Sequence, residues 1–412
     1  MPLSYNSSIC VRPWLHLNFL PNGKVRPCCL MDDETSIIGD LKTESIENIW
    51  NSPKLKKLRK DMLEDKKPEL CKRCYEHEEA NQKSVRMFNN EDFSDYLKKI
   101  PFHTDEDGFN NREDLIYWDF RFTNKCNLRC RSCGPSFSSA WVPDAKKLYG
   151  ATEHVKLTKF EEVNGVTNLD FVKSRIKDAK RIYFAGGEPL IMDEHYLVLD
   201  MLLEAGNTNC NITYNTNLNH LSYKHWNVLD YWRKWPKREL VIWPSIDEIG
   251  ERAEIVRKGT DWSRVEANLK AITAEGWQIH PNITTGALNV FRLPKIITYF
   301  YENGVLTKEE HYANFNINII DFPTHLHIRA LSDSFKQQTK QKILDFLEEF
   351  KNKTSGITIE RFNDRFNYVL KLLDEPQIPE WRDSFILFNE SLDSIRNESL
   401  YDVIPELKDA LQ

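Results

Sequence analysis

The stretch Cys126-Asn-Leu-Arg-Cys130-Arg-Ser-Cys133 places three cysteines on one short loop, with the spacing CX3CX2C. It closely follows residues 115–122, an apolar run that predicts a β-strand. Three thiolates on such a loop can each bind one iron of a [4Fe–4S] cluster, a group that otherwise takes four cysteines. The fourth iron then keeps an open position, which is typical of a catalytic rather than a structural metal site. The spacing alone also fits a structural zinc site that a distant residue completes.

Two arginines, Arg129 and Arg131, lie between these cysteines. A neighbouring cation favours the thiolate form of a cysteine, so we expect both arginines to lower the pKa values of the cysteine thiols. The loop also lies at the carboxyl end of its predicted strand. In barrels of strand–helix units that end carries the chemistry, so we expect the active site there.

Short apolar runs alternate with amphipathic helices from about residue 113 onward. The runs predict strands at residues 115–122, 181–185, 211–215, 240–246, 278–286 and 314–320. Helices are predicted between them, such as 194–205 with Asp193 as N-cap and 264–275 with Ser263 as N-cap. This alternation predicts an α/β fold with a parallel sheet or barrel. Six strands are too few for a closed eight-stranded barrel, so we expect a partial (β/α)6 barrel.

A Gly-Gly-Glu-Pro motif ends the second predicted strand, at Gly186, Gly187, Glu188 and Pro189. Together with CX3CX2C after the first strand, it resembles the signature of the radical S-adenosylmethionine (SAM) superfamily. The resemblance implies that the glycines let the backbone approach the amino group of SAM closely, where a side chain would block it. Glu188 would then contact that amine or stabilise the turn. A Gly-Gly pair by itself would indicate only a tight turn.

Further residues match the superfamily at the ends of the next two strands. Asn215 and Asn217 follow the third strand, where the resemblance implies contacts with the ribose hydroxyls of SAM. Ser245 ends the fourth strand, and Arg257 lies twelve residues later. The resemblance implies that this pair holds the carboxylate of SAM, which the fork of an arginine matches. Arg252 is the competing candidate for that role.

One position departs from the superfamily pattern. Many members have an aromatic residue just before the last cysteine, which packs on adenine, and here that residue is Ser132. Adenine stacking must then come from elsewhere, and residues 288–290 resemble the region that contacts adenine. The match covers about residues 115–330. It implies reductive cleavage of SAM to methionine and a 5′-deoxyadenosyl radical, which abstracts hydrogen from a substrate; no catalytic side chain is assigned.

More cysteines precede the predicted barrel, at Cys10, Cys28, Cys71 and Cys74. With Gly23, the first two form the pattern C-x12-G-x4-C, and the last two form CX2C. This arrangement resembles the SPASM and twitch modules, which carry auxiliary iron–sulfur clusters in a large branch of the superfamily and usually follow the core. The resemblance implies that these four cysteines hold a second [4Fe–4S] cluster. A four-cysteine zinc site fits the same residues.

Two details of this N-terminal segment bear on the ligand set. Cys29 directly follows Cys28 and is an alternative ligand to it. Ala80 stands where the longer form of the module has a further cysteine, so the segment resembles the shorter, twitch-like form with one cluster. Cys210 lies inside a predicted strand, and we expect it to be a buried apolar residue.

Composition excludes several classes of protein. A chain of 412 residues predicts two or three domains, and a net charge of −6 gives no footprint for general nucleic-acid binding. No apolar run approaches the roughly 18 residues of a membrane span, and the first residues lack the pattern of a secretory signal. We therefore expect a cytoplasmic protein. Disulfides are rare there, so the nine cysteines indicate metal or cluster ligation.

The predicted regions are an auxiliary iron–sulfur module at 1–90, a linker at 91–112, a radical SAM core at 113–331 and a C-terminal helical region at 332–412. The resemblance implies an electron donor such as flavodoxin or ferredoxin. We expect a peptide or protein substrate, because the auxiliary module resembles those of superfamily members that modify peptides and proteins. A small metabolite is the alternative. A hypothesis of another class is a non-catalytic iron–sulfur or zinc-binding scaffold.

Overall fold

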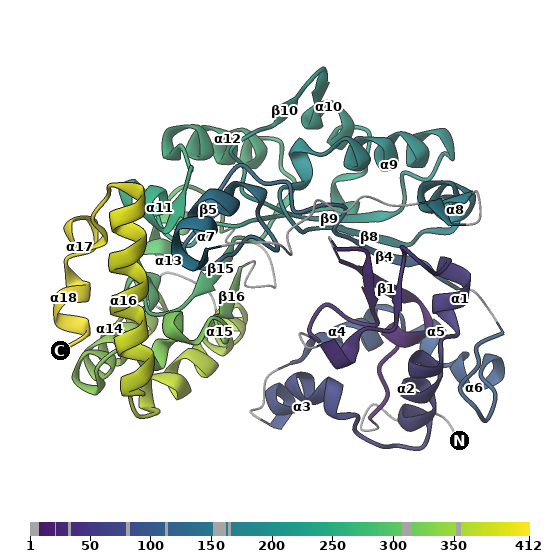
Figure 1. Cartoon of the computed structure of the whole chain (residues 1–412), viewed down its shortest axis with the longest axis horizontal. Helices are drawn as coiled ribbons and strands as arrows, with labels where there is room; N and C mark the ends of the chain where they lie inside the picture. The colour runs from purple at the N-terminus through teal and green to yellow at the C-terminus, as the bar shows by residue number, and fades with distance from the viewer. Residues whose placement is uncertain are drawn as a thin grey trace. The chain divides into compact units, whose positions relative to one another are not determined.

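The computed structural model describes residues 8–20, 22–31, 34–79, 83–111, 114–150, 162–163, 166–306, 315–351 and 356–412. The chain divides into two compact units. The first comprises Met1–Asn124, Lys156–Thr213 and Lys234–Glu239, and the second comprises Lys125–Val155, Tyr214–Arg233 and Leu240–Gln412. Figure 1 labels the elements of both units. In the described part of the chain, no helix combines the length and the apolar character needed to span a membrane.

The first unit is built on a mixed sheet. Its strands are β1 (His16–Phe19), β2 (Lys24–Arg26), β3 (Gly39–Asp40), β4 (Tyr117–Phe120), β8 (Arg181–Phe184) and the first half of β9 (Asn211–Thr216). β4 pairs in parallel with β8 on one side and with β1 on the other (Figure 1). All four residues of β1 and all four of β4 are buried, as expected of strands covered on both faces. The N-terminal segment therefore adds a strand beside the first strand of the predicted barrel.

The helices of the first unit follow their sequence signals closely. They are α1 (Ile46–Trp50), α2 (Pro53–Leu63), α3 (Lys72–Glu79), α4 (Val85–Asp92), α5 (Ser94–Leu97), α6 (Ile100–His103), α8 (Asn168–Arg175) and α9 (Asp193–Glu204). The short strands β6 (Glu162–Val163) and β7 (Val166–Thr167) form a hairpin. The hydroxyl of Ser45 accepts a hydrogen bond from the backbone of Asn48 at the start of α1, and Pro53 begins α2. Pro53 thus restarts the helical segment, because it needs no hydrogen-bond partner at that position.

The stretch expected as a linker, residues 91–112, is not irregular where the structure describes it. It holds α5 and α6, and Phe93, Leu97 and Ile100 are buried. Its many polar residues had indicated a connecting segment, but these apolar side chains recur at helical spacing and pack inward. The boundaries of the four expected regions stay predictions.

The second unit holds further parallel strands. The chain passes between the units within β9, whose neighbour is β12 (Leu240–Pro244), followed by β14 (Gln278–Ile279). β15 (Asn282–Thr285) pairs in parallel with β16 (Asn316–Ile319). Two short antiparallel pairs complete the strands of this unit: β5 (Arg129–Cys130) with β13 (Arg257–Lys258), and β10 (Ser222–Tyr223) with β11 (Trp226–Asn227).

Helices connect and cover these strands, and the last five lie together in the green-to-yellow part of Figure 1. They are α7 (Val142–Tyr149), α10 (Val228–Trp232), α11 (Glu251–Val256), α12 (Trp262–Ala274), α13 (Leu293–Glu302), α14 (Asp333–Lys351), α15 (Gly356–Asp374), α16 (Pro379–Arg396), α17 (Leu400–Val403) and α18 (Glu406–Ala410). The α/β fold class is confirmed. Strands form at all six predicted places, and the strand order β4-β8-β9-β12-β14 follows the chain as a partial (β/α)6 barrel requires.

Three local expectations need correction. The predicted fifth strand is broken into β14 and β15, because Pro281 cannot donate to a strand ladder. The N-cap of α12 is Asp261, whose carboxylate accepts from the backbone of Arg264, and not Ser263. Asp193 is the first residue of α9 and not its N-cap. Residue 314, the expected start of the sixth strand, and Ala80 lie outside the described residues.

Candidate metal centres

The CX3CX2C loop is fixed by backbone pairing in the second unit. Cys130 pairs with Arg257 across the β5–β13 ladder, and the backbone N–H of Arg131 donates to the carbonyl of Val256 at 2.8 Å. The indole N–H of Trp141 donates to the carbonyl of Cys130 at 2.7 Å. The middle of the loop is therefore held from two directions by residues outside it.

Within the loop, turns bring the cysteines toward one another. The backbone N–H of Cys133 donates to the carbonyl of Cys130 at 3.1 Å. The backbone N–H of Leu128 donates to the sulfur of Cys126 at 3.4 Å, so this sulfur turns back over its own loop. Cys130 is buried, and Cys126 and Cys133 are half-buried.

Burial raises the pKa of the Cys130 thiol and raises the pKa of Cys133 to about 12. Arg257 is the cation that opposes both shifts. Burial alone would lower the pKa of Arg257, but Cys130, Asp247 and, more weakly, Cys126 raise it above its usual value. One guanidinium therefore lies within electrostatic reach of all three cysteines.

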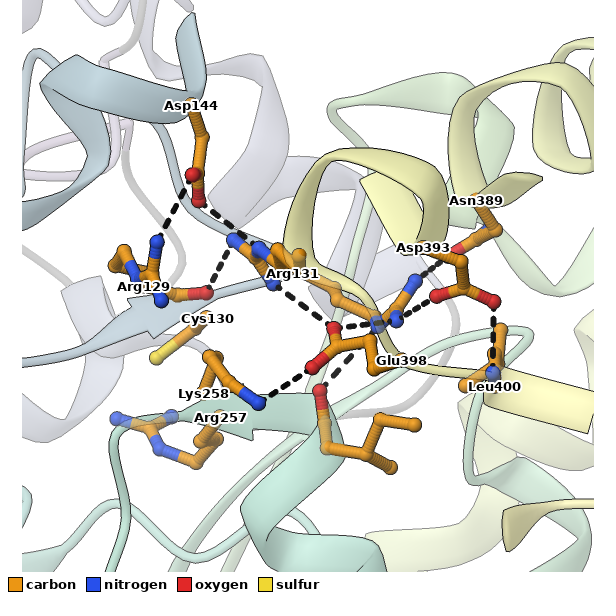
Figure 2. A network of polar contacts seen from close by, with 12 residues as sticks. Arg129, Cys130, Arg131, Asp144, Arg257, Lys258, Asn389, Asp393, Glu398 and Leu400 are labelled. Atoms are coloured by element: carbon orange, nitrogen blue, oxygen red, sulfur yellow. Dashed lines mark hydrogen bonds and ion pairs between the residues drawn. The ribbon is translucent and has the colours of Figure 1, made fainter. Parts of the chain in front are cut away.

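The expectation that Arg129 and Arg131 lower the thiol pKa values is wrong. Arg129 pairs with Asp144 at 2.9 Å, and Arg131 pairs with Asp393 and with Glu398 (Figure 2). Carboxylates from other elements take up both charges, and the thiol pKa values rise instead. Sequence proximity to the cysteines could not reveal these partners.

Of the polar residues at the ends of β9 and β12, Asn217 contacts the cysteine loop directly. The amide of Asn217 donates to the side-chain oxygen of Asn127, inside the loop, at 2.9 Å. Asn215 accepts from Asn282 at 3.5 Å. The backbone N–H of Ser245 donates to the carbonyl of Thr216 at 2.8 Å, which joins the ends of the two strands.

Arg257 is held by an acid that the sequence analysis did not assign to the site. Its Nη1 donates to Oδ2 of Asp247 at 2.8 Å, while Oδ1 of Asp247 accepts from the backbone of Thr284 at 2.8 Å. Asp247 is buried, and its position two residues after Ser245 at a strand end was the available signal. The competing Arg252 is bound to both carboxylate oxygens of Glu406 at 2.9 Å.

Residues around Arg257 also approach the cysteine loop closely. Gly259 has a φ of +100°, and a Cβ there would lie 2.9 Å from the carbonyl oxygen of Asn127. Only glycine fits such a backbone contact without strain. Residues 288–290, which resemble an adenine-contacting region, are buried, and Asn289 donates to the carbonyl of Asp247 at 2.7 Å.

The Gly-Gly-Glu-Pro turn belongs to the first unit. Gly186 has a φ of +75°, and a Cβ there would lie 2.7 Å from Cβ of Arg121. The carboxylate of Glu188 accepts from the backbone N–H of Leu190 at 3.1 Å, and both Glu188 and Pro189 are buried. Of the two roles expected for Glu188, the stabilisation of the turn is therefore present. Gly187 is half-buried beside it.

The four N-terminal cysteines come together in the first unit. Cys10, Cys28, Cys71 and Cys74 all line one cavity, together with Arg12 and Arg86. Cys29 does not line it. The sulfur of Cys29 hydrogen-bonds to that of Cys28 and lowers the pKa of the Cys28 thiol.

Two arginines support this cavity. Nη1 of Arg12 donates to the sulfur of Cys28 at 3.0 Å and to that of Cys29 at 3.4 Å. Arg86 is ion-paired with Glu78 and donates to the carbonyl of Ile9 at 2.8 Å. Burial raises the pKa of Cys10 to about 11, and the two arginines oppose that shift.

The donor sets fit iron–sulfur clusters in number and type. Each cysteine of a cubane binds a different iron, so the thiols need not meet at one point. Within the described ranges, no three His, Cys, Asp or Glu side chains are grouped closely enough to hold a single metal ion. Cys210 is buried, as expected, and lies outside both sets.

Residues 10–75 match the family model of SPASM, described as an iron–sulfur cluster-binding domain. This match confirms the resemblance of the N-terminal cysteines to such a module. No curated protein matches the chain.

Among solved structures, Streptococcus suis SuiB bound to its precursor peptide SuiA is similar at 12% identity with a TM-score of 0.40. The similarity covers 66% of this chain and 54% of that one. The enzyme anSMEcpe with bound AdoMet is similar at 16% identity with a TM-score of 0.37, over 56% of this chain and 57% of that one. This chain therefore spans little more than half the length of either protein. At such TM-scores the likeness says nothing about activity.

Proposed function

We propose that the chain is a radical SAM enzyme, in which Cys126, Cys130 and Cys133 hold a [4Fe–4S] cluster that leaves one iron open for SAM. One observation carries the proposal. Cys130 pairs with Arg257 across the β5–β13 ladder, so the buried guanidinium of Arg257 belongs to the surroundings of the triad, and its charge opposes the rise in the pKa of Cys130 and of Cys133. A structural zinc site completed by a distant residue would need a fourth ligand beside the triad, and a cation is unsuited to that role.

Arg257 would hold the carboxylate of SAM. Its Nη1 is engaged by Asp247, but its Nε is buried and has no hydrogen-bond partner among the described residues. A buried donor left without a partner costs stability, so a ligand with acceptor oxygens fits here. Asp247 would keep the fork oriented, and Ser245 directly follows β12, two residues before Asp247.

The other matched residues would position the remaining parts of SAM. Asn215 and Asn217 would face the ribose, and the turn of Gly186, Gly187, Glu188 and Pro189 would receive the amino group. When bound, the cluster would supply the electron that splits SAM into methionine and a 5′-deoxyadenosyl radical, which then takes a hydrogen atom from the substrate. The protein's own contribution is to orient SAM and exclude water.

The four N-terminal cysteines would hold a second [4Fe–4S] cluster. The SPASM match over residues 10–75 supports iron–sulfur rather than zinc at this site. The shared cavity supports Cys10, Cys28, Cys71 and Cys74 as ligands, with Cys29 outside the set. Four thiolates would leave no open iron, so this cluster would serve electron transfer or structure rather than SAM binding.

We propose a peptide or protein as the substrate, since the N-terminal module of this chain resembles the SPASM-type modules of enzymes that act on peptides and proteins. A reductant such as flavodoxin or ferredoxin would deliver the electron. Both proposals rest on the resemblance of the N-terminal module.

The test is SAM cleavage by the reconstituted chain. The wild type, loaded anaerobically with iron and sulfide and reduced with dithionite, is expected to form 5′-deoxyadenosine from SAM. Cys130→Ala is expected to form none above background. Cys210→Ala, which removes a buried thiol outside both sets, is the matched control and should retain the activity. Cleavage that persists in Cys130→Ala, or is absent from the wild type at full iron loading, would contradict the proposal.

A further inference from the structure

The two arginines inside the cysteine loop point to the far end of the chain. Arg131 is fully buried. Its Nη1 donates to the amide oxygen of Asn389 at 2.8 Å, and its Nη2 pairs with Asp393 and with Glu398. Its Nε donates to the carbonyl of Ile255 at 3.3 Å. Arg131 lies between two cysteines of the loop, yet its side chain binds residues of α16 and of the turn that follows it (Figure 2).

A second buried arginine reaches in the opposite direction. Arg396, near the end of α16, donates to the backbone carbonyl of Arg129 at 2.8 Å and to Asp144 at 2.9 Å. The other oxygen of Asp144 accepts from Arg129 at 2.9 Å. Arg396 also lies over the ring of Trp141, whose indole binds the carbonyl of Cys130. The side chain of Arg131 in the loop therefore binds α16, and the side chain of Arg396 in α16 binds the loop.

Glu398 and Asp393 close this network. Glu398 pairs with Lys258 of β13 at 2.7 Å as well as with Arg131, so one carboxylate joins β13 to the residue that directly follows β5. Asp393 also accepts from the backbone N–H of Leu400 at 2.7 Å, which fixes the turn after α16. The side chains of Glu398 and Asp393 are 9% and 13% exposed, so solvent screens these ion pairs little.

Apolar packing reinforces the same contact. Trp141, Ala145 of α7 and Leu392 of α16 form a buried cluster, and Cys133 packs against it. The last cysteine of the triad therefore rests on a surface that α16 helps to build.

We propose that Asn389, Asp393, Arg396 and Glu398, here called the C-terminal brace, are positioning residues that hold the CX3CX2C loop in its cluster-binding conformation. This inference rests on the proposed function of the triad. It makes the end of α16 part of the metal site, although more than 250 residues separate it from the cysteines. A loop of eight residues with two internal arginines is not rigid by itself, and the brace supplies the missing constraint. Residues that hydrogen-bond to the ligand-bearing segment of a metal site orient its ligands in this way.

The test compares Arg131→Lys with the wild type in the full, reconstituted chain. Lysine keeps the positive charge but has a single ammonium group. That group cannot contact Asp393 of α16 and Glu398 of the following turn at the same time. We expect retention of the triad iron against a chelator to fall about 10-fold, which is the typical effect of removing residues that orient metal ligands. The change that SAM induces in the electron paramagnetic resonance (EPR) spectrum of the reduced protein should shrink in proportion. The component that does not respond to SAM, from the N-terminal cluster, should stay unchanged.

Two further variants keep the test decisive. Arg382→Gln is the matched control, since Arg382 lies on the first turns of α16 and pairs with the exposed Asp383; it should behave as the wild type. Glu398→Gln keeps the shape of the side chain and decides the matter if Arg131→Lys does not fold. Variants that fold and retain the triad iron and the SAM response of the wild type would overturn the brace. A wild type whose iron does not respond to SAM would instead overturn the proposed function, and the brace with it.

Discussion

Cys10 and Cys74 lie far apart in the sequence, whereas Cys126, Cys130 and Cys133 lie within one loop. The first set is collected by the fold of one unit and lines a single cavity. The second set is compact in sequence but takes its support from remote segments, residues 245–259 and 389–398. A short cysteine motif therefore does not form a metal site by itself. Its sequence provides the ligands, and distant residues provide their conformation.

The arginines differ in the same sense. In the N-terminal set Arg12 donates directly to the sulfurs of Cys28 and Cys29. In the triad Arg129 and Arg131 turn away to carboxylates, while Arg257 opposes the rise in the pKa of Cys130 and of Cys133, and Arg396 also opposes that of Cys130. In the proposed four-cysteine site, a cation can bind the ligand sulfurs directly. In the proposed three-cysteine site, Arg257 would instead bind the proposed cosubstrate, SAM.

The largest difference between the two sets is expected in SAM cleavage. We predict that Cys130→Ala loses at least about 100-fold in the rate of 5′-deoxyadenosine formation, because even the loss of a residue that only orients a metal ligand can cost up to that factor. Cys74→Ala should keep a rate near that of the wild type, since its set holds no SAM. Each variant should bind about four irons where the wild type binds about eight. Equal losses of cleavage in both variants would erase the functional distinction between the sets.

The next effect concerns Arg12, the direct thiol partner in the N-terminal set. In Arg12→Gln the charge beside Cys28 and Cys29 is lost, so we expect the N-terminal iron to dissociate about 10-fold faster in the presence of a chelator. The SAM-responsive iron should dissociate at the wild-type rate. If both pools of iron accelerate together, Arg12 acts on the whole chain and not on one set.

Acid should destabilise both units through buried histidines. Burial lowers the pKa of His195, in the first unit, to about 3 and that of His280, in the second, to about 4. Each imidazole is neutral when buried and gains a proton on unfolding below about pH 6.5. Stability is therefore full above that pH and falls by up to about 1.4 kcal/mol per pH unit as the pH decreases toward the folded pKa.

Chemical denaturation of the apo chain between pH 7 and 5 checks this prediction. His195→Gln and His280→Gln should each lose less stability across that range than the wild type does. A variant whose pH slope matches that of the wild type would show that its histidine is not the group that titrates.

The smallest effect contrasts two glycines, one in the Gly-Gly-Glu-Pro turn and one directly after Cys133. Gly186→Ala meets Arg121 and keeps a positive φ, so we expect a loss of about 1–2 kcal/mol from the backbone conformation, plus the cost of moving Arg121. Gly134→Ala, directly after Cys133, has no atom within 4 Å of the new Cβ and should change stability by less than about 0.5 kcal/mol. Thermal unfolding of both variants checks the pair, and similar shifts would refute the contrast.

Local patterns were sufficient to predict much of this molecule. Each of the six strands and the turn at Gly186 follows from apolar runs and turn residues that are close in sequence. The grouping of Cys71 and Cys74 with Cys10 and Cys28 was implied by the resemblance of their spacing to the SPASM and twitch modules.

What could not be predicted depends on pairs of residues far apart in the chain. Nothing near Arg131 indicates that it binds Asp393 and Glu398, since each of those acids alone reads as an exposed helical or loop residue. The pairing of β1 with β4 likewise joins segments about 100 residues apart. Capping errors at Asp193 and Ser263 arose because several side chains near each helix start could serve.

The most direct test of the central claim is the EPR spectrum of the reduced, reconstituted chain before and after addition of SAM. We expect two components in the EPR spectrum of the wild type, of which SAM changes one. Cys74→Ala should retain only the component that SAM changes, and Cys130→Ala only the one that SAM leaves alone. A spectrum of Cys130→Ala that still shifts on addition of SAM would contradict the assignment of the open iron to the triad.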